Sequence, residues 1–305
     1  MKIAALDLGS NSFLCLIAEV HDGKIVHIIK DLVKVVRLGQ QVAQTQMFHE
    51  EALKRAEICL TEFKKEIDQV GNVEKILAYA TAAARDVKNK HLLFEIGKKL
   101  GIEIQIIEGF KEAEVTYNGA ISGLKSDKKV GVVDVGGGST ELILGLNGKI
   151  ICSESVNIGC VKLKEKLITQ QPIPMIDIEK IIAEVSPMFA AITSKIKESG
   201  IDEMVAVAGT PTAIAALDFG KFIPEKVDGF KLTQTNILNR INEFSQKTPQ
   251  QISDQYGLEM GRADIILAGC ILLYISMQTL QLQDLTVSTR GVRYGLALEM
   301  AKNEM

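Results

Sequence analysis

At 305 residues, the chain is long enough to form two domains, each with its own hydrophobic core. Its apolar fraction of 47% and charged fraction of 24% are typical of a soluble globular protein. The net charge of −3 argues against a general nucleic-acid binder, which carries a strong basic excess, although a local basic groove could still hold a polyanion.

The first half of the chain alternates strand and helix patterns. Strands are predicted over 2–8, 13–20, 24–30, 76–81 and 103–107. Helices are predicted over 49–70 and over 110–122, and a further helix, which follows the segment 82–86, is predicted to end at residue 100. A polar connection over 123–129 is the predicted domain boundary. The domains are therefore predicted at 1–123 and 124–305, with the option that the terminal helix packs back on the first.

The second half restarts the same pattern at Val130. Strands are predicted over 141–145, 149–156, 204–208 and 284–288, and the segment 155–166 leads into a predicted helical region. Further helices are predicted over 178–198, from Gly209, after Asp264, and at the end of the chain. Strands that alternate with helices in both halves predict an α/β fold class.

Two segments, ALDLGSNSF at 5–13 and VDVGGGSTE at 133–141, have the same order of strand, aspartate, glycine turn and strand. Glycine permits close approach of backbone N–H groups to an anion, and hydroxyl or amide side chains add hydrogen bonds. Either segment alone could be an ordinary hairpin turn. Their repetition favours duplicated halves that hold one phosphate. The candidate phosphate-binding residues are Gly9, Ser10, Asn11, Ser12, Gly136, Gly137, Gly138, Ser139 and Thr140.

Asp7 and Asp134 stand at the ends of the strands that precede these turns. Carboxylate oxygens in such positions could hold a hydrated Mg²⁺, which prefers oxygen ligands. The four histidines are isolated, so no transition-metal spacing is present. The five scattered cysteines predict reduced, buried thiols. With no signal peptide pattern and no long apolar span, we expect a cytoplasmic protein that is not a membrane protein.

A third candidate anion or nucleotide site is the helix start at Gly209-Thr210-Pro-Thr, with a threonine available as its cap. The alternative is a capped helix after a strand, with no ligand. Arg262 precedes a second apolar helix and could bind phosphate oxygens, or it could cap a helix end.

Together these segments resemble two known groups of proteins. Paired aspartate turns and a third glycine loop resemble the actin, Hsp70 and sugar-kinase superfold. More narrowly, IAALDLGSNSFLCLI, TAAARD, EGFKEAEVTYNGA, VVDVGGGSTELIL, NIGCVKL, VAVAGTPTAIAAL, GRADIILAGCIL and VSTRGVRYGLA resemble the Ppx/GppA phosphatase family, in order over nearly the whole chain. The resemblance implies two ribonuclease H-like domains with an active-site cleft between them.

The resemblance also implies residue roles. Family members use a glutamate before an alanine to orient or deprotonate the attacking water, and Glu112 matches it. Glu114 lies two helix positions away, about 200° of rotation, and cannot face the same cleft. Asp7, Asp134 and Glu141 would hold the metal through waters. Arg85 matches a family arginine near the cleft, and it is either a clamp on the terminal phosphate or one half of a salt bridge with nearby Asp86, a residue outside the described ones, or with another acid.

A chain-like substrate would need a basic channel. Lys162, Lys164 and Lys166 alternate, so on an extended segment they would share one face, and with Lys34, Arg37 and Arg262 they could form that channel. The alternative is a solvated lysine row.

The leading hypothesis is a Mg²⁺-dependent exopolyphosphatase that acts on inorganic polyphosphate. The first alternative is removal of the 5′-terminal phosphate of guanosine pentaphosphate. A kinase on the same superfold and a non-catalytic sensor of guanosine tetra- and pentaphosphate are further alternatives. A homodimer is expected from the resemblance alone.

Overall fold

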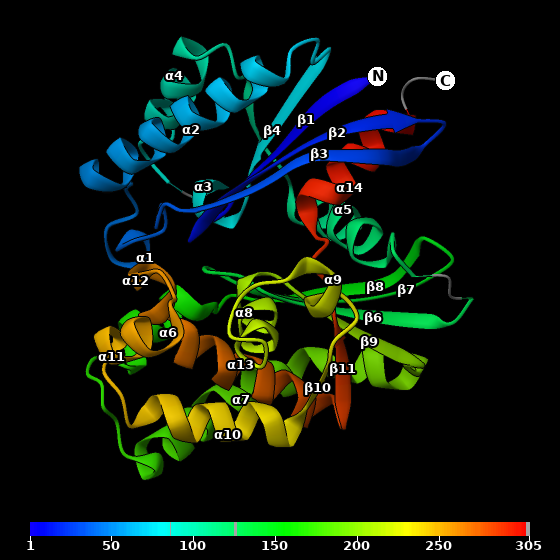
Figure 1. Ribbon diagram of the computed structural model, residues 1–305. Helices are drawn as coiled ribbons and strands as arrows, with labels where there is room; N and C mark the ends of the chain where they lie inside the picture. The colour runs from blue at the N-terminus through cyan, green and yellow to red at the C-terminus, as the bar shows by residue number, and fades with distance from the viewer. Residues whose placement is uncertain (86, 125–126, 303–305) are drawn as a thin grey trace. The chain divides into compact units, whose positions relative to one another are not determined.

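The computed structural model describes residues 1–85, 87–124 and 127–302. The chain divides into two compact units (Figure 1). The first comprises Met1–Ser122 and the residues from Arg290 onward, and the second comprises Gly123–Thr289. The predicted second domain, 124–305, contained the C-terminal segment that groups here with the first unit.

The first unit contains a five-stranded sheet and six helices among the described residues. In chain order its elements are β1 (Lys2–Leu8), β2 (Ser12–His21), β3 (Lys24–Val35), α1 (Val42–Thr45), α2 (Glu50–Val70), β4 (Lys75–Ala80), α3 (Ala82–Arg85), α4 (His91–Lys99), β5 (Ile104–Ile106), α5 (Gly109–Ile121) and α14 (Val292–Lys302).

The second unit contains a six-stranded sheet. In chain order its elements are β6 (Lys129–Val135), β7 (Thr140–Leu146), β8 (Lys149–Val156), α6 (Cys160–Leu167), α7 (Met175–Ser199), β9 (Glu203–Val207), α8 (Gly209–Leu217), α9 (Pro224–Val227), β10 (Lys231–Thr233), α10 (Gln234–Ser245), α11 (Pro249–Tyr256), α12 (Met260–Ala263), α13 (Ile266–Leu280) and β11 (Asp284–Val287).

The two sheets repeat one topology. The first has the strand order β3-β2-β1-β4-β5, and the second has β10-β11-β9-β6-β7-β8. In each, three antiparallel strands are followed by two parallel ones, because β1 pairs parallel with β4 and β6 pairs parallel with β9. This internal duplication was predicted from the paired aspartate turns.

In the first unit both faces of the sheet are covered by helices. Along β1, Leu6 and Leu8 pack with the α2 side chains in one apolar cluster, whereas Ile3 and Ala5 pack with α5 and α14 in another. Figure 1 shows α2 and α4 on one side of this sheet and α14 with α5 on the other. A strand that is buried on both faces reads as a continuous apolar run, as IAAL does.

Helices α5 and α14 approach each other closely at two glycines. A Cβ atom on Gly119 would lie 2.1 Å from the Gly291 carbonyl oxygen, and one on Gly295 would lie 1.9 Å from the Val115 carbonyl oxygen. Lys111 of α5 also pairs with Glu299 of α14. The C-terminal helix therefore fixes the position of α5 within this unit.

A partly buried ion pair joins α14 to the edge strand β3. The Arg293 Nε and Nη2 atoms donate to the two carboxylate oxygens of Asp31 at 2.7 and 2.9 Å, and the Tyr294 hydroxyl donates to Asp31 at 2.9 Å. Two parallel bonds from one guanidinium give this contact a defined geometry.

The core of the second unit is built around α13, most of whose residues are buried. The segment Met260–Leu280 is long and apolar enough to cross a membrane by length and composition alone, but most of its apolar window is buried in the fold. The sequence predicted a helix after Asp264 and no long apolar span, whereas this segment is long enough to be one; its burial is that of a core helix.

Candidate functional site

The first aspartate turn has the predicted hairpin geometry. It connects β1 to β2, and the Gly9 amide donates to the Ser12 carbonyl at 3.1 Å. Ser10 is buried, and the Asn11 amide nitrogen donates to the Ser12 hydroxyl at 3.4 Å. The Asn11 Oδ1 atom is buried and accepts no hydrogen bond among the described residues.

A second loop, over residues 36–39, lies against this turn. The Val36 and Arg37 amides donate to the Asn11 carbonyl at 2.9 and 2.8 Å, and the Gly39 amide donates to the Ser10 carbonyl at 2.7 Å. Arg55 of α2 supports the loop by donating to the Val36 carbonyl at 2.7 Å. Arg37, a predicted channel residue, is thereby held beside the turn, whereas nothing in the sequence pattern singled out Arg55.

Asp7 lies at the end of β1, one residue before Leu8. Its Oδ1 atom is buried without a hydrogen-bond partner among the described residues. Burial raises the pKa of Asp7 to about 7, and nearby Arg293 opposes the rise. A buried acceptor in this state fits a bound cation, because a positive charge would compensate the lost hydration.

This state of Asp7 predicts a pH-dependent cost to stability. Between pH 3.8, the usual pKa of the group, and a pH of about 7, the Asp7 carboxyl is protonated in the folded protein and ionised in the unfolded chain. Stability should therefore fall as pH rises through that window. In EDTA, we expect Asp7→Asn to increase the free energy of unfolding by about 1–3 kcal/mol at pH 8 and by less at pH 5.

Urea unfolding at the two pH values would measure this difference. Asp22→Asn is the matched control, because the Asp22 side chain is 78% exposed. An equal effect of Asp7→Asn at pH 5 and pH 8 would contradict a buried carboxylate that is costly to ionise.

The second aspartate turn repeats the first. It connects β6 to β7, and the Gly136 amide donates to the Ser139 carbonyl at 3.0 Å. Ser139 is buried, as Ser10 is. Thr140 is fully buried, and its hydroxyl donates to the Ile158 carbonyl at 2.8 Å, so this predicted phosphate ligand uses its proton within the fold.

The N-terminus of α6 lies against this second turn. The Cys160 amide donates to the Gly136 carbonyl at 2.9 Å, and the Val161 amide donates to the Gly137 carbonyl at 3.0 Å. A Cβ atom on Gly159 would lie 2.5 Å from the Gly136 carbonyl oxygen, so only glycine fits there. The motif NIGCVKL thus supports the turn at Gly136–Ser139, a role that the sequence pattern did not reveal.

The predicted metal ligands of this unit are direct neighbours. Asp134 of β6 pairs with Glu141 of β7 across the ladder, so both side chains lie on one face of the sheet. Glu141 also accepts a hydrogen bond from the Ser155 hydroxyl at 3.0 Å. Across residues 1–85, 87–124 and 127–302, no three or more His, Cys, Asp or Glu side chains gather as a metal site.

The predicted lysine row was wrong in its geometry. Lys162 and Lys164 lie on the helix α6, not on an extended segment, so they do not share one face. Lys164 donates to the Ile168 carbonyl at 2.7 Å and its side chain is 16% exposed, whereas Lys162 bonds to the Asn157 side chain. The apolar spacing of Cys160, Leu163 and Leu167 set the helix.

The third loop opens α8 as predicted, but its threonines do not cap it. The Thr212 hydroxyl donates to the Ala208 carbonyl at 2.9 Å. Thr210 is buried and faces α13, where a Cβ on Gly269 would lie 2.1 Å from its hydroxyl oxygen. The Gly209 Cβ position lies 4.0 Å from the Arg262 guanidinium carbon, which brings these two predicted residues together. Burial lowers the pKa of Arg262, an effect that Glu259 and Cys160 oppose.

The predicted catalytic residues form an ion pair within the first unit. Glu112 lies in the first turn of α5, where a carboxylate interacts favourably with the helix dipole. Its Oε2 atom pairs with the Nη2 atom of Arg85, the last residue of α3. The Arg85 Nε atom donates to the Ile107 carbonyl at 3.2 Å. Of the predicted roles for Arg85, the ion pair is present, and its acid is Glu112.

Glu114 occupies a different environment on the same helix. It pairs with Lys111 at 3.0 Å, and its side chain is 44% exposed. The Glu112 side chain is only 13% exposed. The two carboxylates therefore separate into a surface ion pair and a sheltered one, as their spacing of two residues predicted.

The topology of the first sheet places these groups at one edge. Strands β1, β4 and β5 run parallel, with Leu8 beside Ala80 and Ala80 beside Ile106. The aspartate turn follows β1, Arg85 follows β4, and Glu112 follows β5. The carboxyl ends of parallel strands are where α/β sheets bind ligands. This edge therefore gathers a phosphate turn, an arginine and a sheltered carboxylate.

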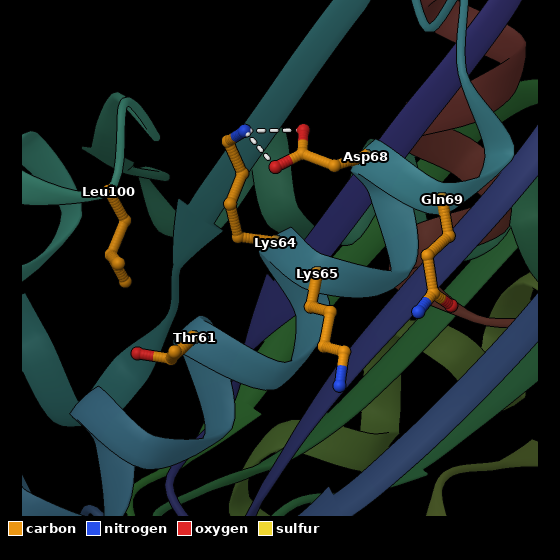
Figure 2. Close-up of a pocket in the computed structure, with 6 residues that line it drawn as sticks. All are labelled: Thr61, Lys64, Lys65, Asp68, Gln69 and Leu100. Carbon is orange, nitrogen blue, oxygen red and sulfur yellow. Dashed lines mark hydrogen bonds and ion pairs between the residues drawn. The ribbon is translucent and has the colours of Figure 1, made fainter.

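A surface depression elsewhere in this unit contains none of the predicted residues. It has a volume of about 540 Å³ and is lined by Thr61, Lys64, Lys65, Asp68, Gln69 and Leu100. Figure 2 shows that five of these residues lie on α2, where Lys64 pairs with Asp68 at 2.5 and 2.7 Å. We assign it no role in the chemistry.

Comparison with known proteins gives a family match over most of the chain. The model of the Ppx/GppA phosphatase family matches residues 16–304. Exopolyphosphatase 2 of Mycobacterium tuberculosis is 30% identical over 98% of this chain and 98% of its own length. A guanosine-5′-triphosphate,3′-diphosphate pyrophosphatase of Vibrio atlanticus is 28% identical over 97% of this chain and 59% of its own length.

Solved structures match the fold along its full length. The Aquifex aeolicus member of the Ppx/GppA protein family has a TM-score of 0.82 at 30% identity, covering 100% of this chain and 98% of that one. An exopolyphosphatase-like protein has a TM-score of 0.91 at 26% identity, covering 99% of this chain and 98% of that one. These matches confirm the predicted α/β fold.

Proposed function

This chain belongs to the Ppx/GppA phosphatase family, and from that membership we propose that it is a Mg²⁺-dependent exopolyphosphatase. It is a hydrolase of phosphoanhydride bonds, as relatives named exopolyphosphatase and pyrophosphatase are. The proposed substrate is inorganic polyphosphate, from which the terminal phosphoryl group is removed.

The observation that carries the proposal is the sheltered pair of Glu112 and Arg85, at the sheet edge that also carries the aspartate turn. Phosphoryl transfer needs positioning and charge stabilisation more than covalent help from the protein. A turn with accessible amides positions the terminal phosphate, and a guanidinium balances charge on its oxygens. A carboxylate beside them can accept a proton from the attacking water.

The proposed reaction accounts for each bond that forms or breaks and for the proton that moves. A lone pair of the water oxygen attacks the terminal phosphorus, and Glu112 receives the proton that the water loses. The bond from phosphorus to the bridging oxygen breaks, and its electron pair stays on the shortened chain. The products are inorganic phosphate and polyphosphate with one residue fewer.

The acidic residues fit a divalent cation. Asp7 has a buried oxygen without a hydrogen-bond partner, and Asp134 and Glu141 lie side by side on their sheet. Asp7 in the first unit, and Asp134 with Glu141 in the second, are the candidate ligands, because Mg²⁺ has hard oxygen ligands and retains waters. When bound, the ion would neutralise charge on the phosphate chain.

The first candidate, polyphosphate, is supported by the 30% identity to exopolyphosphatase 2 over 98% of this chain. The second candidate is supported by the 28% identity to the pyrophosphatase over nearly the whole chain. Both substrates present a terminal phosphoanhydride to the same turns.

Phosphate release from the two substrates, with Mg²⁺ and then with excess EDTA, would test the proposal. We expect release from long-chain polyphosphate with a larger kcat/KM than from guanosine pentaphosphate, and none in EDTA. The opposite preference would establish the second candidate. Absence of release from both, with a folded protein that binds guanosine nucleotides, would overturn the hydrolase assignment.

A further inference from the structure

The ion pair between Arg85 and Glu112 engages the very carboxylate that the proposed reaction needs. The two residues come from separate segments, the end of α3 and the first turn of α5 (Figure 1). The two groups meet as a charge pair, because the buried Nη2 atom of Arg85 has no hydrogen-bond partner among the described residues. A carboxylate beside a cation is less available to accept a proton from water, because the positive charge stabilises its ionised form. In the free protein, therefore, the candidate base is occupied.

Besides this ion pair, one hydrogen bond among the described residues anchors the Arg85 side chain. Its Nε atom donates to the Ile107 carbonyl at 3.2 Å, just after β5. Its Nη1 atom lies 3.8 Å from the position of a Cβ on Gly109, so the start of α5 lies beside the guanidinium. Because the guanidinium is planar and moves as one unit, a swing of its Nη end away from Glu112 also redirects the Nε–H that contacts Ile107.

The pair is sheltered but reachable. The Arg85 side chain is 25% exposed and the Glu112 side chain 13% exposed, so both retain some accessible surface. An ion pair with a purely structural role stabilises the fold only when its geometry is good and its remaining donors have hydrogen-bond partners. The guanidinium has five donors, and among the described residues only its Nε–H makes a hydrogen bond, whereas the buried Nη2 atom makes none.

A terminal phosphoryl group is a stronger partner for Arg85 than Glu112 is. It carries more negative charge than a carboxylate and offers three oxygens to the planar fork of the guanidinium. When it enters beside the turn at Gly9–Ser12, both anions compete for one cation.

We propose that Arg85 is a substrate-responsive latch on Glu112. In the free protein Arg85 pairs with Glu112, and the terminal phosphoryl of a bound chain draws the guanidinium away and frees the carboxylate to accept the proton of water. The exchange replaces one ion pair of Arg85 by another and involves no covalent step. It rests on the proposed function, since the phosphate chain is the ligand that opens the latch.

A double-mutant cycle on ligand binding tests the latch. The probe is imidodiphosphate, whose bridging nitrogen resists hydrolysis, titrated calorimetrically with Mg²⁺ into the wild type, Arg85→Gln, Glu112→Gln and the double variant. If the carboxylate competes for Arg85, Glu112→Gln should tighten binding about tenfold when Arg85 is present and less than about twofold when it is absent. Arg85→Gln alone should weaken binding about tenfold.

The control is Glu114→Gln, which removes a carboxylate of the neighbouring surface pair on the same helix and should leave binding unchanged. Arg85→Lys retains the charge without the fork, and it keeps the cycle interpretable if Arg85→Gln does not fold. The latch is overturned if Glu112→Gln tightens binding equally with and without Arg85, or does not tighten it.

The two proposals fail in different ways. If the wild type hydrolyses polyphosphate normally but the double-mutant cycle shows no coupling between Arg85 and Glu112, the latch is wrong and the proposed function stands. Wild-type protein that releases no phosphate from either substrate would overturn the proposed function, whatever the cycle shows.

Discussion

Replacing Glu112 by glutamine is expected to lower kcat for phosphate release by about 10²–10⁴-fold, the usual contribution of a positioned general base. Glutamine keeps the shape of the side chain but cannot accept the proton of the attacking water. KM should not rise, because the substitution removes a negative charge near a polyanionic substrate. Steady-state phosphate release with polyphosphate would measure both constants.

Glu114→Gln is the matched control for this prediction. It makes the same chemical change two residues away, on a side chain that pairs with Lys111 at the surface. We expect its kcat to stay within about twofold of the wild type, as for other surface substitutions. Equal losses in the two variants, or full activity of Glu112→Gln, would remove Glu112 from the mechanism.

Replacing Gly295 by alanine is expected to reduce the free energy of unfolding by about 3 kcal/mol or more. The new Cβ would lie 1.9 Å from the Val115 carbonyl oxygen, so α5 and α14 would have to separate. Because Glu112 is carried by α5, the same displacement should lower kcat in protein that remains folded. Urea unfolding and phosphate release on one preparation would test both effects.

Gly291→Ala provides the comparison, since a Cβ at that position would meet nothing within 4 Å. We expect its stability to lie within about 0.5–1 kcal/mol of the wild type. If the two alanine variants were equally stable, the close approach of α5 and α14 would not constrain the fold.

Local patterns predicted most elements of secondary structure. The strand predicted over 149–156 is β8 at the same residues, and the helix predicted over 49–70 is α2 at Glu50–Val70. The alternation of lysines in VKLKEK led to a wrong prediction of an extended segment. This segment is short and polar, and three alternating lysines do not distinguish a solvated helix from a strand. There the burial of Cys160, Val161 and Leu163 favoured the helix.

The candidate site was predicted in its parts rather than in its assembly. Both aspartate turns have the predicted hairpin bond, because glycine and the following small residues determine that geometry locally. Glu112 was assigned from resemblance, and its sheltered position relative to Glu114 follows from helix periodicity. Gly159 and Arg55 were missed, because their supporting contacts join segments far apart in the chain.

By itself, the sequence determined the family, the duplicated α/β pattern and the two phosphate turns, since these depend on local periodicity and on glycine at specific positions. Only the tertiary structure decided that Arg85 pairs with Glu112, that Asp31 neutralises Arg293, and that the last helix fixes α5. Each of these contacts depends on which strands lie side by side and how closely helices approach. Those relations arise from packing between distant segments, and no local pattern encodes them.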